Sequence, residues 1–449
     1  MDDLELRIIE KIKPKKDESN AIFFFVDQLL AVAERVAKPF SAYPVIVGSI
    51  AKDTFLKNGY DVDLFIVFRE KIKREKLEEF GLLIGTTISE DMGGKYNLKY
   101  AEHPYVRAEI SGHSVDIVPC YEFTAGNKVI SAVDRSPLHT RYVKEHLTGY
   151  MKDQARLMKY FCKQTDVYGA DARHEGVSGY LCELFIIQWG SFAKALEKIS
   201  KLDFRSYIDI DGISSEREAK KQFREALIFI DPTDKDRNVA SPLSPQNFFR
   251  LKKEAKKYTE GGSFPALKKK VVNLLVEKLK SERGTSFAGA RFRPPEMVPE
   301  NLYPQLRRFE RHLARHLHEN GFGVVRHLSW TDEENLAVIV VEVESSTLSR
   351  YRSQAGPTIF SGEIDNFLEK YLGGKYPPYI ERGQFFATVK RRLQNVDTAV
   401  KDFLSNRREE IPGKISEQKI RVLKEEEIIE LSRENKDFNS YLAGKYLEI

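Results

Sequence analysis

One short stretch constrains this chain more than any other. An apolar run ends in Val47-Gly48-Ser49, and after eleven further residues Asp61-Val62-Asp63 opens a second apolar run. Both runs have the composition of buried strands. Side chains two positions apart on a strand point to the same face, so Asp61 and Asp63 can present two carboxylates to one point. The stretch therefore predicts a sheet that carries paired carboxylates beside a glycine turn.

A third carboxylate, Asp116, follows in an apolar segment. Val106–Ile110 and Ser114–Val118 predict a β-hairpin around Ser111-Gly112-His113. Three converging carboxylates would repel one another strongly without a metal ion. Hard cations prefer oxygen ligands, and Mg²⁺ is usually held by one or two carboxylates plus substrate phosphates. Two such ions can align an attacking hydroxyl with a phosphate.

Gly48-Ser49 would form the phosphate side of such a site. A glycine between a strand and a helix lets the backbone approach a phosphate, and a helix start offers free N–H groups. Lys52 is placed to add a positive charge. An isolated Asp-x-Asp motif usually lies on a solvated strand face, and a Gly-Ser turn before a helix is common. The combination of both motifs with Asp116 is what favours a metal site.

Length and composition bound the class of protein. A chain of 449 residues predicts about three domains, and 41% hydrophobic residues suffice for several cores. No apolar run approaches the roughly 20 residues that span a bilayer, so no membrane partner is expected. The three cysteines have no metal-site spacing and fit structural thiols in a reducing cytoplasm. The net charge of +5 decides little by itself.

Periodicity and turn signals predict the coarse secondary structure. Helices are expected at 6–38 (broken at Pro14), 71–90, 150–275 (interrupted at 231–234), 301–320, 362–372 and 414–449, with a helical turn at 51–56. Strands are expected at 44–47, 61–68, 106–110, 114–118, 323–328, 336–343 and 384–389. The strands from 323 onward and the helix at 362–372 predict a βαβ-like small domain.

The carboxylate arrangement resembles the DNA polymerase β-type nucleotidyltransferase superfamily, and further landmarks resemble the archaeal (class I) CCA-adding enzymes. These landmarks run in order from residue 47 to about 310, with weaker similarity to about 390, while the final 55 or so residues depart from the family. They are Tyr100–Val106, Val115–Tyr121, Ser131–His139, Tyr168–Ala170, Gly179–Leu184, Asp231-Pro232, Arg237–Ala240 and Asn301–Leu306.

The resemblance implies an α+β multidomain fold. Its parts would be a polymerase β-type nucleotidyltransferase head (a mixed sheet with helices), a helical neck, and an α/β body and tail. The implied boundaries are 1–135 for the catalytic head, 136–257 for the neck with nucleotide-binding residues, 258–310 and 385–449 for the body, and 311–384 for a tRNA-binding tail.

The resemblance also implies an activity. Such enzymes rebuild the 3′-terminal CCA of tRNA from CTP and ATP without a nucleic-acid template. Asp61, Asp63 and Asp116 would be the catalytic residues and would hold two Mg²⁺ ions. Asp116 would sit nearest the tRNA 3′-hydroxyl, which attacks the α-phosphate in line while pyrophosphate leaves. The implied partners are the acceptor arm of tRNA, CTP, ATP and a second copy of the chain as a homodimer.

The nucleotide contacts implied by the resemblance are Gly48, Ser49, Lys52, His139, Lys159, Tyr168 and Arg237. The family usually has arginine where this chain has Lys52, which keeps the charge and loses the bidentate fork. His139, Lys159 and Tyr168 match triphosphate and ribose contacts, and Arg237 matches the arginine near the nucleobase. Without the resemblance, each of these residues has an ordinary structural role as a helix cap, a solvated lysine, a core aromatic or a surface ion pair.

Residues 252–392 are locally basic and are expected to hold the tRNA acceptor arm. A-form RNA is read mainly through shape, phosphates and 2′-hydroxyls, which suits an enzyme that accepts every tRNA. For any single arginine, a solvated surface role is the better interpretation. The candidates are Arg291, Arg293, Arg308, Arg311 and Arg315.

Three other functions compete with this interpretation. A poly(A) or oligoadenylate synthase would share the head and use ATP alone. A non-catalytic tRNA-binding protein would keep a relict head, although all three carboxylates are present. A small-molecule nucleotidyltransferase, such as an aminoglycoside-modifying enzyme, would not need about 300 residues of mostly basic extension.

Overall fold

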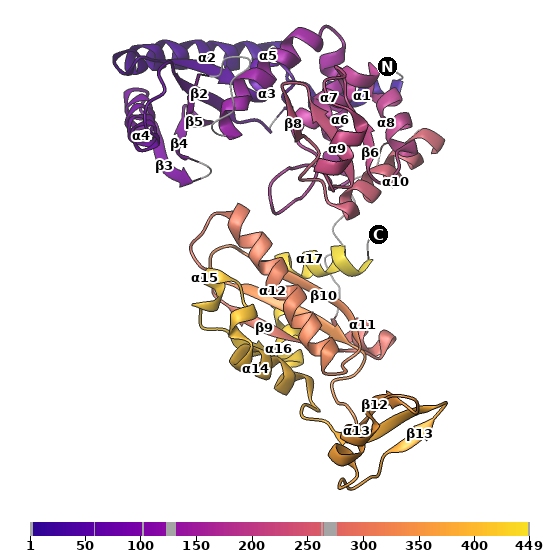
Figure 1. Ribbon diagram of the computed structural model, residues 1–449. Helices are drawn as coiled ribbons and strands as arrows, with labels where there is room; N and C mark the ends of the chain where they lie inside the picture. The colour runs from indigo at the N-terminus through magenta and orange to yellow at the C-terminus, as the bar shows by residue number, and fades with distance from the viewer. Residues whose placement is uncertain are drawn as a thin grey trace. The chain divides into compact units, whose positions relative to one another are not determined.

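The computed structural model describes residues 3–57, 59–100, 103–122, 132–261, 264 and 276–447. The chain divides into two compact units, Met1–Lys268 and Lys269–Ile449 (Figure 1). The finer division into head, neck, body and tail, at 135, 257, 310 and 384, stays a prediction.

The first unit opens with a mixed five-stranded sheet, as expected. Its strand order is β1 (Ala42–Val47), β2 (Val62–Phe68), β5 (His113–Tyr121), β4 (Pro104–Ile110) and β3 (Lys95–Tyr100). β2 and β5 run parallel, and the other neighbours are antiparallel. The edge strand β3 is not among the predicted strands. All its residues are exposed, so its alternating apolar side chains do not mark a core.

Alternation along β2 decides what each face of this sheet carries. Val62, Leu64 and Ile66 are buried in one core with the helices α2 (Lys16–Ala37) and α4 (Arg74–Asp91), which lie along the sheet in Figure 1. Phe65 and Val67 belong to a smaller core on the opposite face. Asp63 has the parity of Phe65, so its carboxylate lies on the face away from α2 and α4.

The hairpin of β4 and β5 closes through two residues with positive φ, Ser111 at 50° and Gly112 at 80°. This is the conformation of a type I′ turn, whose twist matches the twist of the flanking strands. The tight turn pairs Ile110 with His113 and thereby sets the register of the whole hairpin. The predicted hairpin is confirmed, with both strands longer than expected and the turn one residue shorter, because His113 begins β5.

Helices dominate the rest of the first unit. They are α1 (Asp3–Ile12), α3 (Gly48–Ala51), α5 (Ser136–His146), α6 (Met151–Gln164), α7 (Gly179–Trp189), α8 (Phe192–Lys201), α9 (Glu216–Gln222) and α10 (Pro245–Gly261). Most of them pack around one large core, although Ile50 of α3 lies in the core of the five-stranded sheet and Ala219 of α9 lies in a small separate core. The helical turn expected at 51–56 is wrong by several residues, because α3 begins at the glycine itself.

A small sheet corrects the expectation that residues 150–275 are helical apart from one interruption. Its strands are β6 (Ser206–Ile208), β7 (Leu227–Asp231) and β8 (Asp234–Asn238). β7 is buried at every position. A short continuous apolar run such as this cannot be told from a buried helix by periodicity alone.

The second unit is built on an antiparallel sheet in the order β10 (Val324–Thr331), β11 (Ala337–Val343), β9 (Ser286–Phe292) and β15 (Arg421–Leu423). The helices α12 (Pro299–Glu319) and α14 (Val396–Asn406) pack in the core on one face. α11 (Val276–Arg283), α16 (Glu425–Glu434) and α17 (Lys436–Leu447) pack in the core on the other. Helices on both faces explain why β11 is buried throughout.

A second, separate sheet contains β12 (Tyr351–Thr358), β14 (Gln384–Lys390) and β13 (Tyr379–Glu381), with α13 (Ile364–Tyr371) beside it. The expectation of one βαβ-like domain is therefore wrong, because β10 and β11 belong to the other sheet and the strands around α13 pair antiparallel. No helix in the described ranges is long and apolar enough to cross a membrane.

Candidate active site

The three aspartates come from adjacent strands of the first sheet. Asp63 on β2 is the register partner of Asp116 on the parallel strand β5, and Asp61 directly precedes β2. Their side chains share the face that α2 and α4 leave open. The side chain of Asp61 is about half exposed, at 52%, whereas that of Asp116 is only 15% exposed. The predicted pairing of the carboxylates on one face is thus explained by a parallel strand pair in register.

Crowding of negative charge perturbs Asp63. Burial raises the pKa of its carboxyl, and the neighbouring charges of Asp116 and Asp61 raise it further, to about 7. Like charges disfavour ionisation of a buried acid. A cation bound between these groups would relieve the same repulsion.

Arg107 on β4 supplies a positive charge at this point. It is the register partner of Asp116, and its Nε and Nη2 lie 2.7 and 2.8 Å from the two carboxylate oxygens. Its Nη2 also lies 3.7 Å from Asp61 Oδ2. Asp116 is therefore held in a bidentate ion pair, the strong form of a charge-assisted hydrogen bond.

The donor set fits a divalent cation by its chemistry, since hard cations take carboxylate oxygens. Within the described ranges, no three His, Cys, Asp or Glu side chains are grouped to hold a metal ion as they stand. Both oxygens of Asp116 are engaged by Arg107 in this arrangement.

Gly48 borders the aspartates at the start of α3. Its φ is +71°, a conformation that other residues adopt only with strain, and a Cβ at this position would lie 2.0 Å from Asp63 Oδ2. Only glycine permits this approach. Ser49, the next residue, is half-buried, and its carbonyl accepts a hydrogen bond from the Thr54 amide at 2.9 Å.

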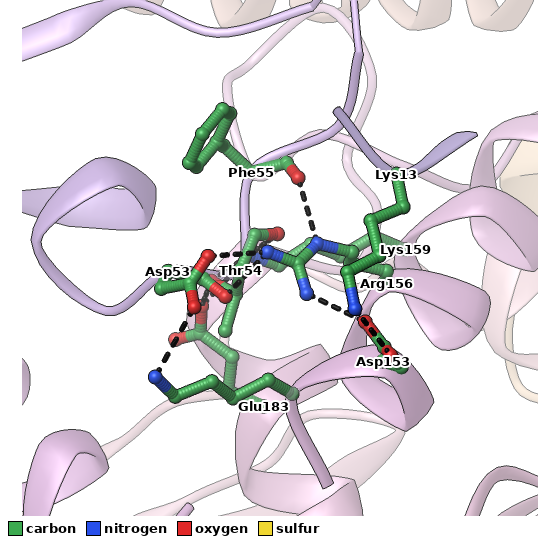
Figure 2. A network of polar contacts seen from close by, with 9 residues as sticks. Lys13, Asp53, Thr54, Phe55, Asp153, Arg156, Lys159 and Glu183 are labelled. Carbon is green, nitrogen blue, oxygen red and sulfur yellow. Dashed lines mark hydrogen bonds and ion pairs between the residues drawn. The ribbon is translucent and has the colours of Figure 1, made fainter. Parts of the chain in front are cut away.

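Lys52 and Lys159 meet at one buried carboxylate, that of Glu183 on α7. Lys52 Nζ lies 2.8 Å from Oε2, and Lys159 Nζ lies 2.7 Å from Oε1. Thr54 Oγ1 donates to Oε1 at 2.6 Å and accepts from Lys159 at 2.8 Å (Figure 2). Burial raises the pKa of Glu183, but the two ammonium groups outweigh it and lower the pKa to about 2. Burial lowers the pKa of Lys159, and the Glu183 carboxylate counteracts this. With both ammonium groups charged, the cluster carries a net positive charge.

Arg156 on α6 anchors the segment that follows α3. Its side chain is 2% exposed, and it donates to the carbonyl oxygens of Phe55 and Asp53 and to the carboxylates of Asp53 and Asp153. Figure 2 shows its guanidinium enclosed by these acceptors. The segment between the glycine turn and β2 is thereby fixed to the neighbouring helices.

A second cluster forms around Asp231, which is fully buried at the end of β7. His139 Nε2 and Arg237 Nη1 lie 2.8 and 2.6 Å from its Oδ2, and Tyr180 donates to its Oδ1 at 3.2 Å. Burial lowers the pKa of His139 despite the carboxylate. Because an ionised carboxylate only accepts, Nε2 carries the proton of the neutral ring.

Tyr180 links the two clusters. Its ring stacks on that of His139 at a centroid distance of 4.0 Å. Lys52 Nζ, which belongs to the Glu183 cluster, lies 5.4 Å from the centroid of the Tyr180 ring. Tyr168 also lies near Lys159, because a Cβ at Gly179 would meet Tyr168 Oη at 3.0 Å and Lys159 Cε at 3.5 Å. The structure thus links Lys52, Lys159, His139 and Arg237 through Glu183, Tyr180 and Asp231, and it places Tyr168 close to Lys159.

The arginines predicted to contact RNA lie in the second unit. Arg308, Arg311 and Arg315 are exposed on α12, and their spacing of three and four residues puts them on one face. Arg293 Nε donates to the Glu334 carbonyl at 3.4 Å, and Arg291 lies 3.9 Å from Glu427. Three of the five candidates therefore form one basic stripe.

Five residues of this site are absent from the predicted set: Arg107, Arg156, Tyr180, Glu183 and Asp231. The sequence contains a signal that could have indicated two of them. Glu183 is a lone carboxylate within an apolar helix, and a buried charge requires a partner. Arg107 follows from the hairpin register, which places it opposite Asp116.

Three family models match the chain in succession. The nucleotidyltransferase domain matches residues 31–139, the second domain of tRNA nucleotidyltransferase matches 153–266, and the C-terminal domain of the CCA-adding enzyme matches 283–423. Nucleotidyltransferases of this kind use divalent metal ions. Among solved structures, a cytoplasmic RNA terminal U-transferase is similar over 58% of this chain and 94% of its own, at 15% identity and a TM-score of 0.44.

Curated relatives match across nearly the whole chain. The CCA-adding enzyme of Methanocaldococcus jannaschii is 33% identical over 414 residues, which is 89% of either chain. That of Thermoplasma volcanium is 36% identical over 392 residues, or 86% of this chain and 85% of its own. That of Archaeoglobus fulgidus is 33% identical over 80% of each. The chain therefore belongs to the family of archaeal CCA-adding enzymes, the tRNA nucleotidyltransferases.

Proposed function

We propose that this chain adds and repairs the 3′-terminal CCA of tRNA, using CTP and ATP without a nucleic-acid template. The observation that carries the proposal is the similarity to CCA-adding enzymes over 80–89% of both chains. The three family models match consecutive parts of the chain, at 31–139, 153–266 and 283–423, and together they cover most of it.

In this proposal, the tRNA 3′-hydroxyl attacks the α-phosphate of the incoming nucleotide beside Asp61, Asp63 and Asp116. These three residues would hold two Mg²⁺ ions, which supply charge neutralisation at the attacking and leaving oxygens when bound. Asp116 would take the position nearest the 3′-hydroxyl and favour its deprotonation. The parallel register of Asp63 with Asp116 supports a shared role for the two carboxylates.

The triphosphate would lie along the Gly48-Ser49 turn. Gly48 lets the backbone approach closely, and the net positive charge of Lys52 and Lys159 around Glu183 favours an anion there. Both ammonium groups are buried and paired in the free protein. We therefore propose that they act mainly through their electrostatic field on the triphosphate and by holding the Gly48-Ser49 turn in place. Tyr168 and His139 would line the ribose and triphosphate beside them.

The nucleobase would meet Arg237. Its guanidinium is held by Asp231, and its side chain remains 34% exposed, so donors stay available for the acceptors of a base edge. Asp231 would act as a positioning residue, since it is buried and bonds His139, Tyr180 and Arg237 together.

The acceptor arm of tRNA would bind the second unit. The exposed stripe of Arg308, Arg311 and Arg315 supports phosphate contacts that carry no sequence information. Head, neck, body and tail would follow the boundaries 1–135, 136–257, 258–310 with 385–449, and 311–384. A homodimer and a cytoplasmic location are part of the proposal and rest on the family resemblance.

The test is to incubate the full chain with Mg²⁺, CTP, ATP and tRNA that lacks its 3′ CCA, and to sequence the extended ends. We expect addition of C, C and A, which is lost when Asp61 and Asp63 are replaced by alanine. Addition of A alone, or of a run of A, would assign the chain to ATP-dependent polymerases. Tight tRNA binding without any addition would indicate a relict head.

A further inference from the structure

Among the residues that the structure describes, Arg107 makes the contact at the aspartates that conflicts with metal binding. Its guanidinium engages both oxygens of Asp116 at 2.7 and 2.8 Å and reaches towards Asp61 at 3.7 Å. A cation that enters between these carboxylates would meet an arginine already in place. Two positive groups repel each other, so both cannot gain fully from the same carboxylate.

The two partners of this ion pair differ in how easily they can leave it. Asp116 is 15% exposed and shares its sheet face with the apolar Phe65, Val67 and Cys120. A carboxylate in such a position needs a positive partner. The Arg107 side chain is 41% exposed, so water can solvate its guanidinium when it leaves Asp116. Asp116 is therefore the fixed member of the pair, and Arg107 is the exchangeable one.

Arg107 also neutralises part of the charge that the three aspartates concentrate at one point. Without a positive group there, the carboxylates of Asp61, Asp63 and Asp116 would repel one another in the metal-free protein. The arginine comes from the neighbouring antiparallel strand in direct register, so its placement is built into the hairpin.

We propose that Arg107 competes with the divalent cation for Asp116. It holds the carboxylate while the metal is absent and releases it when the metal binds. This inference rests on the proposed function, because it takes the three aspartates as the metal ligands. It goes further by making the affinity of the site for metal depend on a residue that is not a ligand.

The experiment measures Mn²⁺ binding to the full chain without nucleotide or tRNA, by the electron paramagnetic resonance signal of free Mn²⁺. Arg107→Gln is expected to bind Mn²⁺ roughly threefold to tenfold more tightly than the wild type, which is the scale of a partly exposed ion pair. Arg107→Lys keeps the charge without the bidentate fork and should fall between them. A second readout is thermal unfolding, where Mn²⁺ should raise the melting temperature of Arg107→Gln more than that of the wild type.

Arg35→Gln is the matched control. It also removes an arginine from an ion pair of the first unit, with Asp91 at 2.8 Å, but one between α2 and α4 rather than on the face of the aspartates. Its Mn²⁺ affinity should equal that of the wild type. In the background of Asp116→Asn, the change Arg107→Gln should no longer tighten binding.

Equal or weaker Mn²⁺ binding by Arg107→Gln, in a chain that still adds CCA, would overturn this inference alone. Absence of Mn²⁺ binding by the wild type would overturn the proposed metal site and the inference with it. If Arg107→Gln does not fold without metal, the affinity of Arg107→Lys decides the question by the same criterion.

Discussion

Gly48 lies so close to Asp63 that a methyl group on its Cα would stand 2.0 Å from the Asp63 carboxylate. The glycine begins the turn assigned to the triphosphate, and the aspartate belongs to the proposed metal site. Since Val47 and Asp63 are also register partners on β1 and β2, the two halves of the site are joined by backbone pairing. Both the turn assigned to the triphosphate and the proposed metal site therefore require residue 48 to lack a side chain.

Replacement of Gly48 by alanine should abolish nucleotide transfer, with a loss of at least about a hundredfold, because it displaces Asp63 by more than the tolerance of such sites. Positive φ adds about 1 kcal/mol of destabilisation. Gly112→Ala is the control, since Gly112 has a φ of +80° and nothing within 4 Å of its Cβ position. It should lose only the roughly 1 kcal/mol that positive φ costs and keep its activity. Equal activity losses in the two variants would contradict the clash with Asp63.

Asp63→Asn should lose activity and yet stabilise the metal-free protein at pH 8. The folded-state pKa of Asp63 is about 7, above the model-compound value of 3.8, so the folded state prefers the protonated acid. Its contribution to stability is fully present below pH 3.8 and is lost progressively as pH rises to about 7. Thermal unfolding in EDTA should show the variant melting well above the wild type at pH 8, by less at pH 5.5, and close to it only below about pH 3.8. Asp91→Asn, at an exposed ion pair, should show no such gain at pH 8.

Much of the catalytic half of the site follows from sequence, and the reason is local. The apolar runs around Val47, residues 61–68 and Asp116 each predict a strand, and period-two alternation puts the aspartates on one face. The partner of Asp116 does not follow from the expected hairpin, because a three-residue turn at 111–113 would place Ile117 opposite Arg107, whereas the two-residue turn at Ser111 and Gly112 places Asp116 there.

The nucleotide half does not follow from local pattern. Glu183 follows Lys52 by more than 100 residues in the chain, and Lys159 lies between them. The contact of the two lysines with Glu183 depends on how α6 and α7 pack beside α3. His139 and Arg237 are joined through Asp231 in a small sheet whose strands read as helix or loop. Only the family resemblance points to these residues, and their partners are a product of tertiary packing.

Glu183→Gln should destabilise the protein near neutral pH and progressively less in acid. The folded-state pKa of Glu183 is about 2 and its model-compound value is 4.5. Because the unfolded chain binds the proton more readily, the stabilisation is complete above pH 4.5 and is lost as pH falls towards 2. Urea unfolding at pH 6 and pH 3.5 should show the gap between wild type and variant shrinking.

Glu197→Gln provides the comparison for Glu183, since Glu197 pairs with Lys201 at 2.6 Å on an exposed helix surface. Exposed pairs contribute little, so this variant should match the wild type within about 0.5 kcal/mol at both values of pH. A gap for Glu183→Gln that stayed constant with pH would show that its carboxylate is not the charged centre of the network.

Asp231→Asn should raise the KM for CTP and for ATP by about tenfold, the scale of one charge-assisted hydrogen bond to Arg237. It should change kcat less, because Asp231 acts by positioning the arginine. Asp234→Asn, three residues along the chain, removes an ion pair with Arg135 at 2.9 Å and serves as the control. Steady-state kinetics with each nucleotide separates the two cases, and equal KM values in both variants would refute the positioning role.

Replacement of Arg308, Arg311 and Arg315 together by glutamine should weaken tRNA binding and flatten its dependence on salt. Each phosphate contact releases about one counterion, so the slope of log affinity against log salt should fall by two to three. These side chains are exposed, and the buried face of α12 is apolar, so stability should change little. The control replaces Arg217, Lys220 and Lys221 on α9, which removes the same charge from the first unit. If both triple variants lowered the slope equally, net charge rather than the α12 stripe would account for binding, whereas loss confined to the α12 variant would assign the phosphate contacts to that helix.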